Sequence, residues 1–209
     1  MRTLLFILML SALSLFGQNE RQFNRIGLKQ GLSKTFASSI IKDHQGYIWI
    51  ATKNGINRYN AYEFKVFNYD VEDPNSINSD VVHVVFEDAS HRIWLGTDKG
   101  MNLFNRELGK FTKVVLDSVN GVDANQLRIL DIVQDQNGNL WVGTWGQGVL
   151  LFDVENNKLV DVLNNRDQNH YHRSNHIRQL FIDGKNSLWV GTNGGGVSKV
   201  NTSTYECYT

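Results

Sequence analysis

The sequence predicts an all-β fold, a β-propeller built from four-stranded blades. A tryptophan-centred segment occurs four times, and its tryptophans are separated by 45, 47 and 48 residues. A repeat of this length that divides into four short strand-like pieces is typical of propeller blades, because helical repeats of similar length would show a 3.6-residue periodicity. The composition agrees, since one proline, 18 glycines and 11% aromatic residues suit a protein of short strands and tight turns.

The repeated segment carries the same kinds of residue at fixed distances from its tryptophan. An aspartate stands six residues before the tryptophan, a glycine or alanine two residues after it, and a threonine three residues after it. We expect the aspartate to accept backbone N–H bonds in an Asx turn, the first glycine to let an adjacent backbone approach closely, and a later glycine to supply a positive φ. The tryptophans are expected to fill the wedges between blades at equivalent buried places. These structural residues are Trp49, Trp94, Trp141 and Trp189 with Asp43, Asp88, Asp135 and Asp183.

The first 17 residues have the layout of a secretory signal peptide. One arginine is followed by an apolar run from Leu4 to about Phe16 and then by small and polar residues. The run is too short to span a bilayer, so we expect cleavage near Gly17 and export to the periplasm. Residues 18–38 are predicted to form a lead-in strand, QFNRI at 22–26, followed by a loop.

The remainder of the chain divides into four blades, at residues 39–70, 80–115, 127–163 and 176–209. In the first blade the strands are SSIIKD, YIWIAT, INRYN and EFKVFNY, separated by turn-forming residues. The inner strands are apolar on successive residues, which indicates that neighbouring blades cover both faces of each sheet. The prediction is therefore sixteen antiparallel strands in four sheets, with almost no helix.

The closure of the propeller has three possible forms. The last repeat has a segment for its own fourth strand, YECYT, so the lead-in strand has no vacancy to fill. Either further blades follow in the native protein, or the four units close in an unusual way, or the chain self-associates through an exposed edge. We favour a segment of a larger propeller.

Charge and cysteine content exclude several classes of partner. Lysine and arginine number 21, as do aspartate and glutamate, so bulk charge attracts neither nucleic acid nor anionic lipid. The single cysteine, Cys207, is interpreted as a small apolar strand residue rather than half of a disulfide. No later segment is apolar enough to cross a membrane.

No residue pattern predicts catalysis, a cofactor or a metal site. His170, His172 and His176 fall in a long polar segment without cysteines or patterned acids, and we interpret them as part of a solvated loop. Each repeat has one aspartate rather than the alternating acids of a calcium loop. The glycines at 191–196 lack the Lys-Ser/Thr of a phosphate-binding loop, and no Ser-His-Asp or paired-carboxylate arrangement stands out. An enzyme is therefore unsupported, although propellers can host hydrolases and lyases.

The candidate ligand-binding residues are those that vary among the repeats at one face. Trp145 breaks register, because the other repeats hold lysine, aspartate and asparagine at its position. A tryptophan on a turn could stack on the apolar face of a sugar, or it could pack against the loop of the neighbouring blade. His83 and Arg178 both stand five residues before the aspartate of their repeat, on the strand expected to line the central channel. The candidate set is Trp145, His83, Arg178 and Asn193.

The repeat pattern, D-x-x-G-x-[IL]-W-[ILV]-[GA]-T-x-x-G-[ILMV]-x-x-[FY], resembles the two-component regulator propeller repeat. The segment FNRIGLKQGLSKTFASSIIKDHQGYIWIATKNGINRYN resembles the usual start of such a sensor, and DPNSINSD at 73–80 resembles its common inter-blade loop. The resemblance extends from Phe23 to Thr209, with small departures at Ala51 and Val200. Other propeller families fit less well, because neither a Trp-Asp dipeptide nor a kelch-type double glycine recurs.

This resemblance implies the periplasmic sensor region of a hybrid two-component system of Bacteroidetes, in which seven-bladed propellers precede a membrane helix, a histidine kinase, a receiver and a DNA-binding module. It implies a glycan breakdown product as ligand, control of polysaccharide-use genes as outcome, and a homodimer in the complete receptor. Remaining blades or a second copy of the sensor are the expected partners. This segment carries no kinase motif, so we expect no catalytic output and no contact with nucleic acid. The alternatives are a stand-alone exported propeller that binds carbohydrate or protein and, less favoured, a propeller enzyme.

Overall fold

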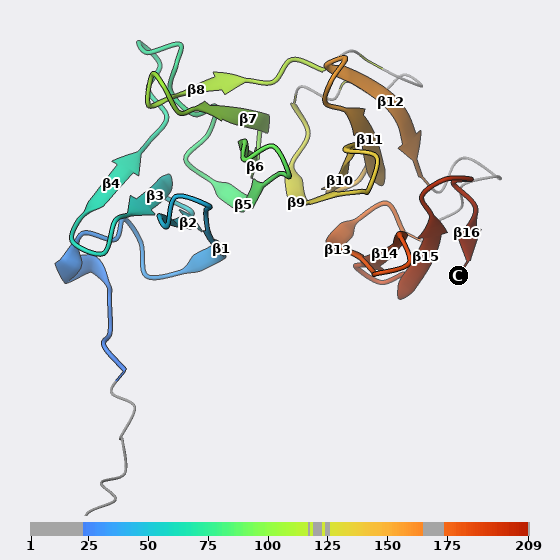
Figure 1. Ribbon diagram of the computed structural model, residues 1–209, viewed down its shortest axis with the longest axis horizontal. Coiled ribbons are helices and arrows are strands. Elements are labelled where there is room, and N and C mark those ends of the chain that lie inside the picture. The colour runs from blue at the N-terminus through green and yellow to red at the C-terminus, as the bar shows by residue number, and fades with distance from the viewer. Residues whose placement is uncertain (1–22, 117, 119–122, 124–125, 165–173, 209) are drawn as a thin grey trace, which may run out of the picture.

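A computed structural model of the protein describes residues 23–116, 118, 123, 126–164 and 174–208, so the signal peptide predicted at 1–17 lies outside the described residues. The described chain forms sixteen strands in four antiparallel sheets of four strands each, which confirms the predicted fold class. Figure 1 shows the four sheets side by side as the blades of a propeller. Within each blade the strands are joined in sequence order, so every connection within a blade is a hairpin.

The strands are short, two to six residues each, and they are numbered along the chain. Blade 1 consists of β1 (Ala37–Lys42), β2 (Ile48–Thr52), β3 (Ile56–Tyr59) and β4 (Phe64–Phe67). Blade 2 consists of β5 (Val82–Glu87), β6 (Ile93–Thr97), β7 (Gly100–Asn105) and β8 (Lys110–Lys113). Blade 3 consists of β9 (Ile129–Gln134), β10 (Leu140–Thr144), β11 (Val149–Asp153) and β12 (Lys158–Leu163). Blade 4 consists of β13 (Ile177–Ile182), β14 (Ser187–Thr192), β15 (Val197–Asn201) and β16 (Cys207–Tyr208).

The blades are arranged in an arc that is open on one side (Figure 1). The first strand of each blade lies on the concave side of the arc, and the fourth strand forms the convex rim. Neighbouring inner strands contact one another, β1 with β5, β5 with β9 and β9 with β13. Two side chains four residues before a repeat aspartate bridge these strands, because Ser39 Oγ accepts from Val85 N at 3.3 Å and Asp131 Oδ2 from Leu180 N at 2.7 Å.

Each repeat aspartate organises the hairpin between the first and second strands of its blade. In blade 3, Asp135 Oδ1 accepts N–H bonds from Asn137 at 2.9 Å and Asn139 at 3.0 Å. Its other oxygen, Oδ2, accepts the indole N–H of Trp141 at 2.9 Å. The same three bonds form in the other blades, at 2.8–3.0 Å. The predicted Asx turn is confirmed, and the bond to the indole explains the six-residue spacing.

Three of the four repeat tryptophans are buried, but Trp189 is not. Trp49, Trp94 and Trp141 are at most 2% exposed, whereas Trp189 is 39% exposed. Each buried indole packs edge-on against an aromatic ring of the following blade, at centroid distances of 4.9, 6.0 and 5.8 Å. No described blade follows blade 4, so no ring of a following blade packs on Trp189, and the Lys199 ammonium group lies over its ring, at 5.3 Å. The prediction of four equivalent buried tryptophans is therefore wrong for Trp189.

The two ends of the arc each present an uncovered sheet face. In blade 4 the residues that share a face with Trp189 are open as well, and Val197 is 61% exposed although the equivalent Val149 of blade 3 is fully buried. In blade 1, Ile40 is 63% exposed, whereas the equivalent Val85 of blade 2 is 2% exposed. These faces correspond to the two sides of a blade-to-blade contact.

The glycine two residues after the repeat tryptophan faces a side chain of the next blade. A Cβ atom added to Gly96 would lie 2.6 Å from Cγ2 of Ile129, and one added to Gly143 would lie 2.8 Å from Cγ2 of Ile177. Both isoleucines begin the inner strand of the following blade, so the predicted close approach of a backbone is instead the approach of a side chain. The later glycine has the expected positive φ, for example 82° at Gly148.

The predicted lead-in strand is wrong over its described part, because residues 23–26 belong to no strand. Figure 1 shows this segment running away from the blades, where no sheet edge accompanies it. The 3₁₀ helix η2 (Leu28–Gln30) follows, and Ser33 then joins blade 1 through a 2.9 Å bond from its N–H to Asn57 Oδ1. The first strand begins at Ala37 rather than at residue 39. Among the described residues we find no helix with the length and apolar character that a membrane span requires.

Candidate functional site

The four candidate ligand-binding residues lie at one end of the blades. Trp145 and Asn193 are the first residues of the turns that follow β10 and β14, and His83 and Arg178 are the second residues of β5 and β13. The second strand of each blade runs antiparallel to the first, so its end lies beside the start of the inner strand. We call this end of the molecule the Trp145 face.

Trp145 lies against two side chains of blade 4. Its ring meets the imidazole of His176 edge-on, with 4.6 Å between the ring centroids. The guanidinium carbon of Arg178 lies 4.8 Å from the centroid of the indole, a cation–π contact. Trp145 nonetheless remains partly exposed. These contacts are the packing that the sequence leaves open as the alternative to sugar stacking, and part of the ring stays accessible to solvent.

Asn193 and His176 are joined through the backbone. The N–H of Asn193 donates to the carbonyl of His176 at 2.8 Å, and the carbonyl of Asn193 accepts from the Ser174 hydroxyl at 2.9 Å. The structure therefore brings three of the four predicted residues, Trp145, Arg178 and Asn193, together around His176. Because the Ser174 hydroxyl donates to a carbonyl and not to an imidazole, it has no activating base in this arrangement.

His83 lies one blade away but belongs to a connected series of contacts. Its Nε2 atom lies 2.7 Å from Asp98 Oδ1, and Arg128 Nε lies 2.7 Å from the same oxygen. The carbonyl of Arg128 in turn accepts the backbone N–H of Trp145 at 2.9 Å. The Trp145 face thus combines a partly exposed indole with two guanidinium groups, two imidazoles and one carboxylate.

Sequence reasoning missed three residues of this face, namely Asp98, Arg128 and His176. Asp98 occupies the register position of Trp145, so the rule that identifies Trp145 could also have found it. The sequence predicts a solvated loop at His176, whereas this residue contacts Trp145 directly. His170 and His172, for which the prediction is the same, lie outside the described residues. Arg128 could not be predicted from the sequence, because nothing in the repeat pattern distinguishes the residue before an inner strand.

A groove of about 350 Å³ opens beside the turn that carries Asp98, and it is lined by blade 2 and by the connections that precede and follow this blade. The ammonium group of Lys99 lies over the ring of Tyr69 at 5.6 Å and forms part of its wall. Two polar side chains, Asn78 and Gln126, also face it. None of the four predicted residues lines this groove. It is a second concave surface next to the candidate residues rather than a pocket around them.

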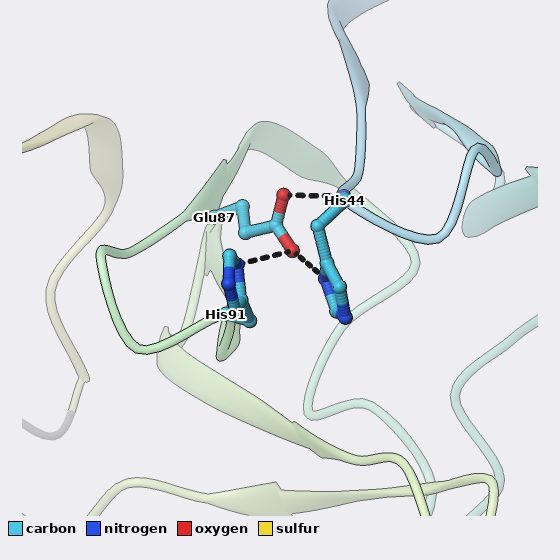
Figure 2. Close-up of side chains that lie close together, drawn as sticks. All are labelled: His44, Glu87 and His91. Carbon is cyan, nitrogen blue, oxygen red and sulfur yellow. Dashed lines mark hydrogen bonds and ion pairs between the residues drawn. The ribbon is translucent and has the colours of Figure 1, made fainter.

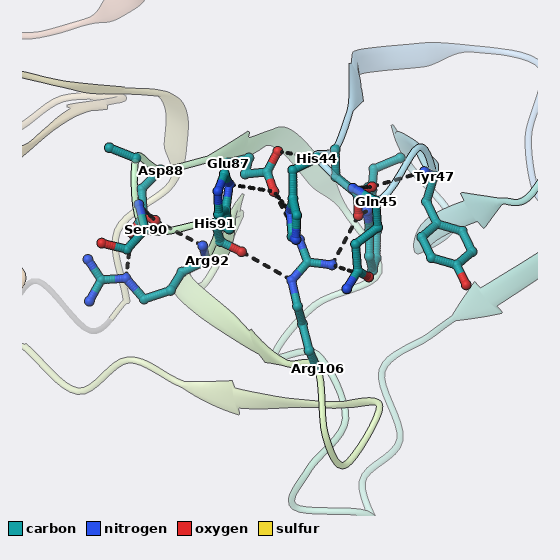
Figure 3. A network of polar contacts seen from close by, with 12 residues as sticks. His44, Gln45, Tyr47, Glu87, Asp88, Ser90, His91, Arg92 and Arg106 are labelled. Carbon is teal, nitrogen blue, oxygen red and sulfur yellow. Dashed lines mark hydrogen bonds and ion pairs between the residues drawn. The ribbon is translucent and has the colours of Figure 1, made fainter.

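The opposite end of blades 1 and 2 carries an ionic network centred on Arg106, which we call the Arg106 face (Figure 3). Arg106 Nη1 donates to Asp43 Oδ2 at 3.1 Å, and Nη2 donates to Glu87 Oε1 at 3.0 Å. Its Nε donates to the carbonyl of His91 at 3.1 Å. Arg106 projects from the turn between β7 and β8, so this one side chain ties the first hairpins of two blades together.

The Asp43 carboxyl reflects this environment. Burial by itself would raise its pKa, but the bonds that it accepts from the indole of Trp49, from Arg106 and from the N–H of Tyr47 outweigh burial and lower the pKa. Asp43 is therefore held as the carboxylate. The charge stabilises both the turn and the contact between blades.

Asp131 shows the opposite behaviour on the inner strand β9. Its carboxyl is largely removed from water, and this burial raises its pKa to about 6. The N–H groups of Leu180 and Ile132 donate to its two oxygens and oppose the rise. An acid that exchanges its proton near neutral pH thus lies between the inner strands of blades 3 and 4.

Comparison with known protein families identifies the repeat. Residues 31–54, 124–146 and 172–194 match the family model described as two component regulator propeller. These segments contain Trp49, Trp141 and Trp189, and the copy around Trp94 carries the same pattern. Three of the four repeats are two-component regulator propeller repeats. Each matched segment contains the first hairpin of its blade, where the aspartate–indole bond forms. Each segment ends in the turn after the second strand, which in blades 3 and 4 belongs to the Trp145 face.

Proteins similar to this chain include a histidine kinase and two extracellular domains of putative hybrid two-component systems. A 56-residue stretch, 27% of this chain, is 30% identical to histidine kinase P4 of Formosa agariphila and covers 4% of that protein. The extracellular domain of a putative hybrid two-component system from B. thetaiotaomicron has a similar fold, with a TM-score of 0.71, 19% identity, and coverage of 83% of this chain and 24% of that one. A second such domain from B. thetaiotaomicron matches with a TM-score of 0.58, 20% identity, and coverage of 88% and 31%. The chain therefore spans about a quarter to a third of these solved structures.

Proposed function

We propose that this chain is the ligand-sensing propeller segment of a two-component signal transduction receptor, exported to the periplasm and without catalytic output of its own. The repeat type supports this proposal, as do the similar folds of two extracellular domains from putative hybrid two-component systems. The predicted signal peptide supports export.

The observation that carries the proposal is the grouping around Trp145. An indole beside imidazole, guanidinium and amide groups suits a polyhydroxylated ligand, because the apolar face of a sugar stacks on the ring while its hydroxyls bond to the polar groups. We therefore propose a glycan breakdown product as ligand. The residues proposed to contact it are Trp145, Arg178 and Asn193, with His83 reached by a longer oligosaccharide.

Arg178 sets a condition on this binding. Its guanidinium lies over the indole at 4.8 Å, so a sugar must use the other face of the ring or displace the side chain. If the arginine moves aside, it becomes a donor for a ligand carboxylate, and Arg128, the residue before β9, offers a second donor. A panel of ligands should therefore contain both neutral and uronic-acid oligosaccharides.

The test is isothermal titration calorimetry of the sensor region with such a panel. Truncating a stacked indole removes about 1–2 kcal/mol, so we expect Trp145→Ala to bind about tenfold more weakly than the wild type. Tyr62→Ala is the matched control, because Tyr62 is 93% exposed on the turn between β3 and β4 and lies away from the Trp145 face. Unchanged affinity in a folded Trp145→Ala variant would remove Trp145 from the site, and turnover of any sugar would replace the sensor proposal with an enzyme.

The uncovered faces at the ends of the arc suggest the partners of this segment. Trp189 and Val197 on blade 4 occupy positions that the following blade covers elsewhere, and Ile40 on blade 1 occupies a position that the preceding blade covers. Further blades or a second copy of the sensor are the proposed occupants. In the complete receptor we propose a homodimer whose ligand-bound state controls genes for polysaccharide use.

A further inference from the structure

Two histidines and a glutamate from different blades converge on the Arg106 face (Figure 2). His44 belongs to the first hairpin of blade 1, while Glu87 and His91 flank the first hairpin turn of blade 2. One nitrogen or oxygen atom from each of the three side chains lies within 4.8 Å of the other two. We propose that these residues form a binding site for a divalent transition-metal ion, which would join blade 1 to blade 2.

The orientation of the side chains supports this site. His44 Nδ1 lies 2.6 Å from Glu87 Oε1, and His91 Nδ1 lies 3.7 Å from the same oxygen. Figure 2 shows both imidazoles turned toward the carboxylate. The other oxygen, Glu87 Oε2, accepts the backbone N–H of His44 at 2.9 Å, which fixes the carboxylate at the joint between the blades. Two imidazole nitrogens and one carboxylate oxygen therefore face a common point.

The ligand chemistry selects the kind of ion. Imidazole nitrogen suits zinc, copper and nickel, whereas calcium and magnesium prefer ligands made only of oxygen. Ligand atoms around a tetrahedral zinc ion stand about 3.3 Å apart, so the atoms here need shifts of about an ångström. His91 can supply this movement, because its side chain is 59% exposed and is held mainly by stacking on His44, with 4.0 Å between the ring centroids. Water would complete the coordination.

Arg106 competes with the ion. Its Nη2 atom donates to Glu87 Oε1 at 3.0 Å, so its charge occupies the oxygen that the metal requires. The same Nη2 atom lies 3.4 Å from His44 Nδ1, so a metal ion would displace both of its contacts. Arg106 would keep its bonds to Asp43, Gln45 and the carbonyl of His91, which hold the side chain in place. The affinity of the site is set by this competition, and removal of the guanidinium should strengthen metal binding.

The experiment is calorimetric titration of the exported chain with Zn²⁺ at pH 7.5, followed by thermal unfolding with and without the ion. We expect one ion per chain, a rise in the midpoint of unfolding that EDTA reverses, and a loss of at least tenfold in affinity in His44→Gln and in His91→Gln. Arg106→Gln should bind several-fold more tightly. Binding should weaken between pH 7.5 and pH 5.5, because imidazole binds metals only as the neutral base.

Controls separate this site from the other histidines. A variant with His170→Gln and His172→Gln, and a His176→Gln variant, should bind Zn²⁺ like the wild type. The visible spectrum of bound Co²⁺ reports four-coordinate geometry in the wild-type protein, so the proposal remains testable even if a variant fails to fold. No saturable binding up to millimolar Zn²⁺, or loss of binding with His170 and His172 rather than with His44, would overturn the site. If Arg106 competes with the ion, the Arg106→Gln variant must bind Zn²⁺ more tightly than the wild type. Unchanged or weaker binding would refute the competition.

Discussion

The indole N–H of Trp141 donates a hydrogen bond to Asp135 Oδ2 at 2.9 Å, and both residues are at least nine-tenths buried. The bond fixes the tryptophan ring relative to the hairpin that the same aspartate closes. In each blade, one carboxylate therefore determines both the turn and the position of the tryptophan side chain that a following blade would cover.

Removing this bond should destabilise blade 3 more than blade 4. Trp141→Phe leaves a buried carboxylate oxygen without its donor, and we expect a loss of about 1–3 kcal/mol in the free energy of unfolding. Trp189→Phe should cost less, because Trp189 and its partner Asp183 are open to water. Urea unfolding followed by circular dichroism measures both values. Equal losses would show that burial of the bond does not matter.

The glycine after the repeat tryptophan should tolerate a methyl group only where no side chain of a following blade meets it. Gly96→Ala brings Cβ to 2.6 Å from both Ile129 and Val84, so we expect a loss of about 1–3 kcal/mol from overpacking. Gly191→Ala is the matched control, because its nearest neighbour would be a carbonyl oxygen at 3.5 Å. Thermal unfolding of the two variants should place only Gly96→Ala clearly below the wild type.

Asp131 should make stability depend on pH between about 4 and 6. The pKa of its carboxyl is raised from 3.8 to about 6, so over this range the unfolded chain loses the proton while the folded chain keeps it. The free energy of unfolding therefore falls as the pH rises, by roughly 3 kcal/mol at most from this group. Asp131→Asn should lack this contribution and gain stability relative to the wild type at pH 7.5. Asp161→Asn, which removes a carboxylate on the outer strand β12, should leave the contribution in place.

The uncovered faces of blades 1 and 4 should make the isolated chain self-associate. Ile40 and Trp189 are 63% and 39% exposed at positions that other blades bury, and apolar surface of this kind favours association. We expect the sedimentation coefficient to rise with protein concentration, and Ile40→Lys or Trp189→Lys to suppress the rise. Tyr62→Lys, a change on neither face, should behave like the wild type. A concentration-independent monomer would contradict this prediction.

The four blades, the Asx turns and the positive φ of the later glycine could be predicted because repetition identifies residues that build every blade alike. Residues that act between repeats were harder to predict. Nothing in the sequence brings His44 beside Glu87, since they are 43 residues apart and meet only when blade 1 contacts blade 2. The exposure of Trp189 escaped prediction for a related reason, because an identical motif has a different environment when no neighbour covers it. The prediction of a lead-in strand is wrong because strand-forming residues do not reveal whether a sheet edge is available to them.

The covering of each repeat tryptophan by the next blade also gives the assembly a direction. At every junction, the tryptophan face of one blade packs against the opposite face of the next blade. An open row of such blades therefore always leaves one repeat tryptophan exposed, and only a closed ring leaves none. The fluorescence of Trp189 therefore reports whether the ring of blades is closed. Its emission should shift to shorter wavelength, and become resistant to a soluble quencher, when another blade seals that face.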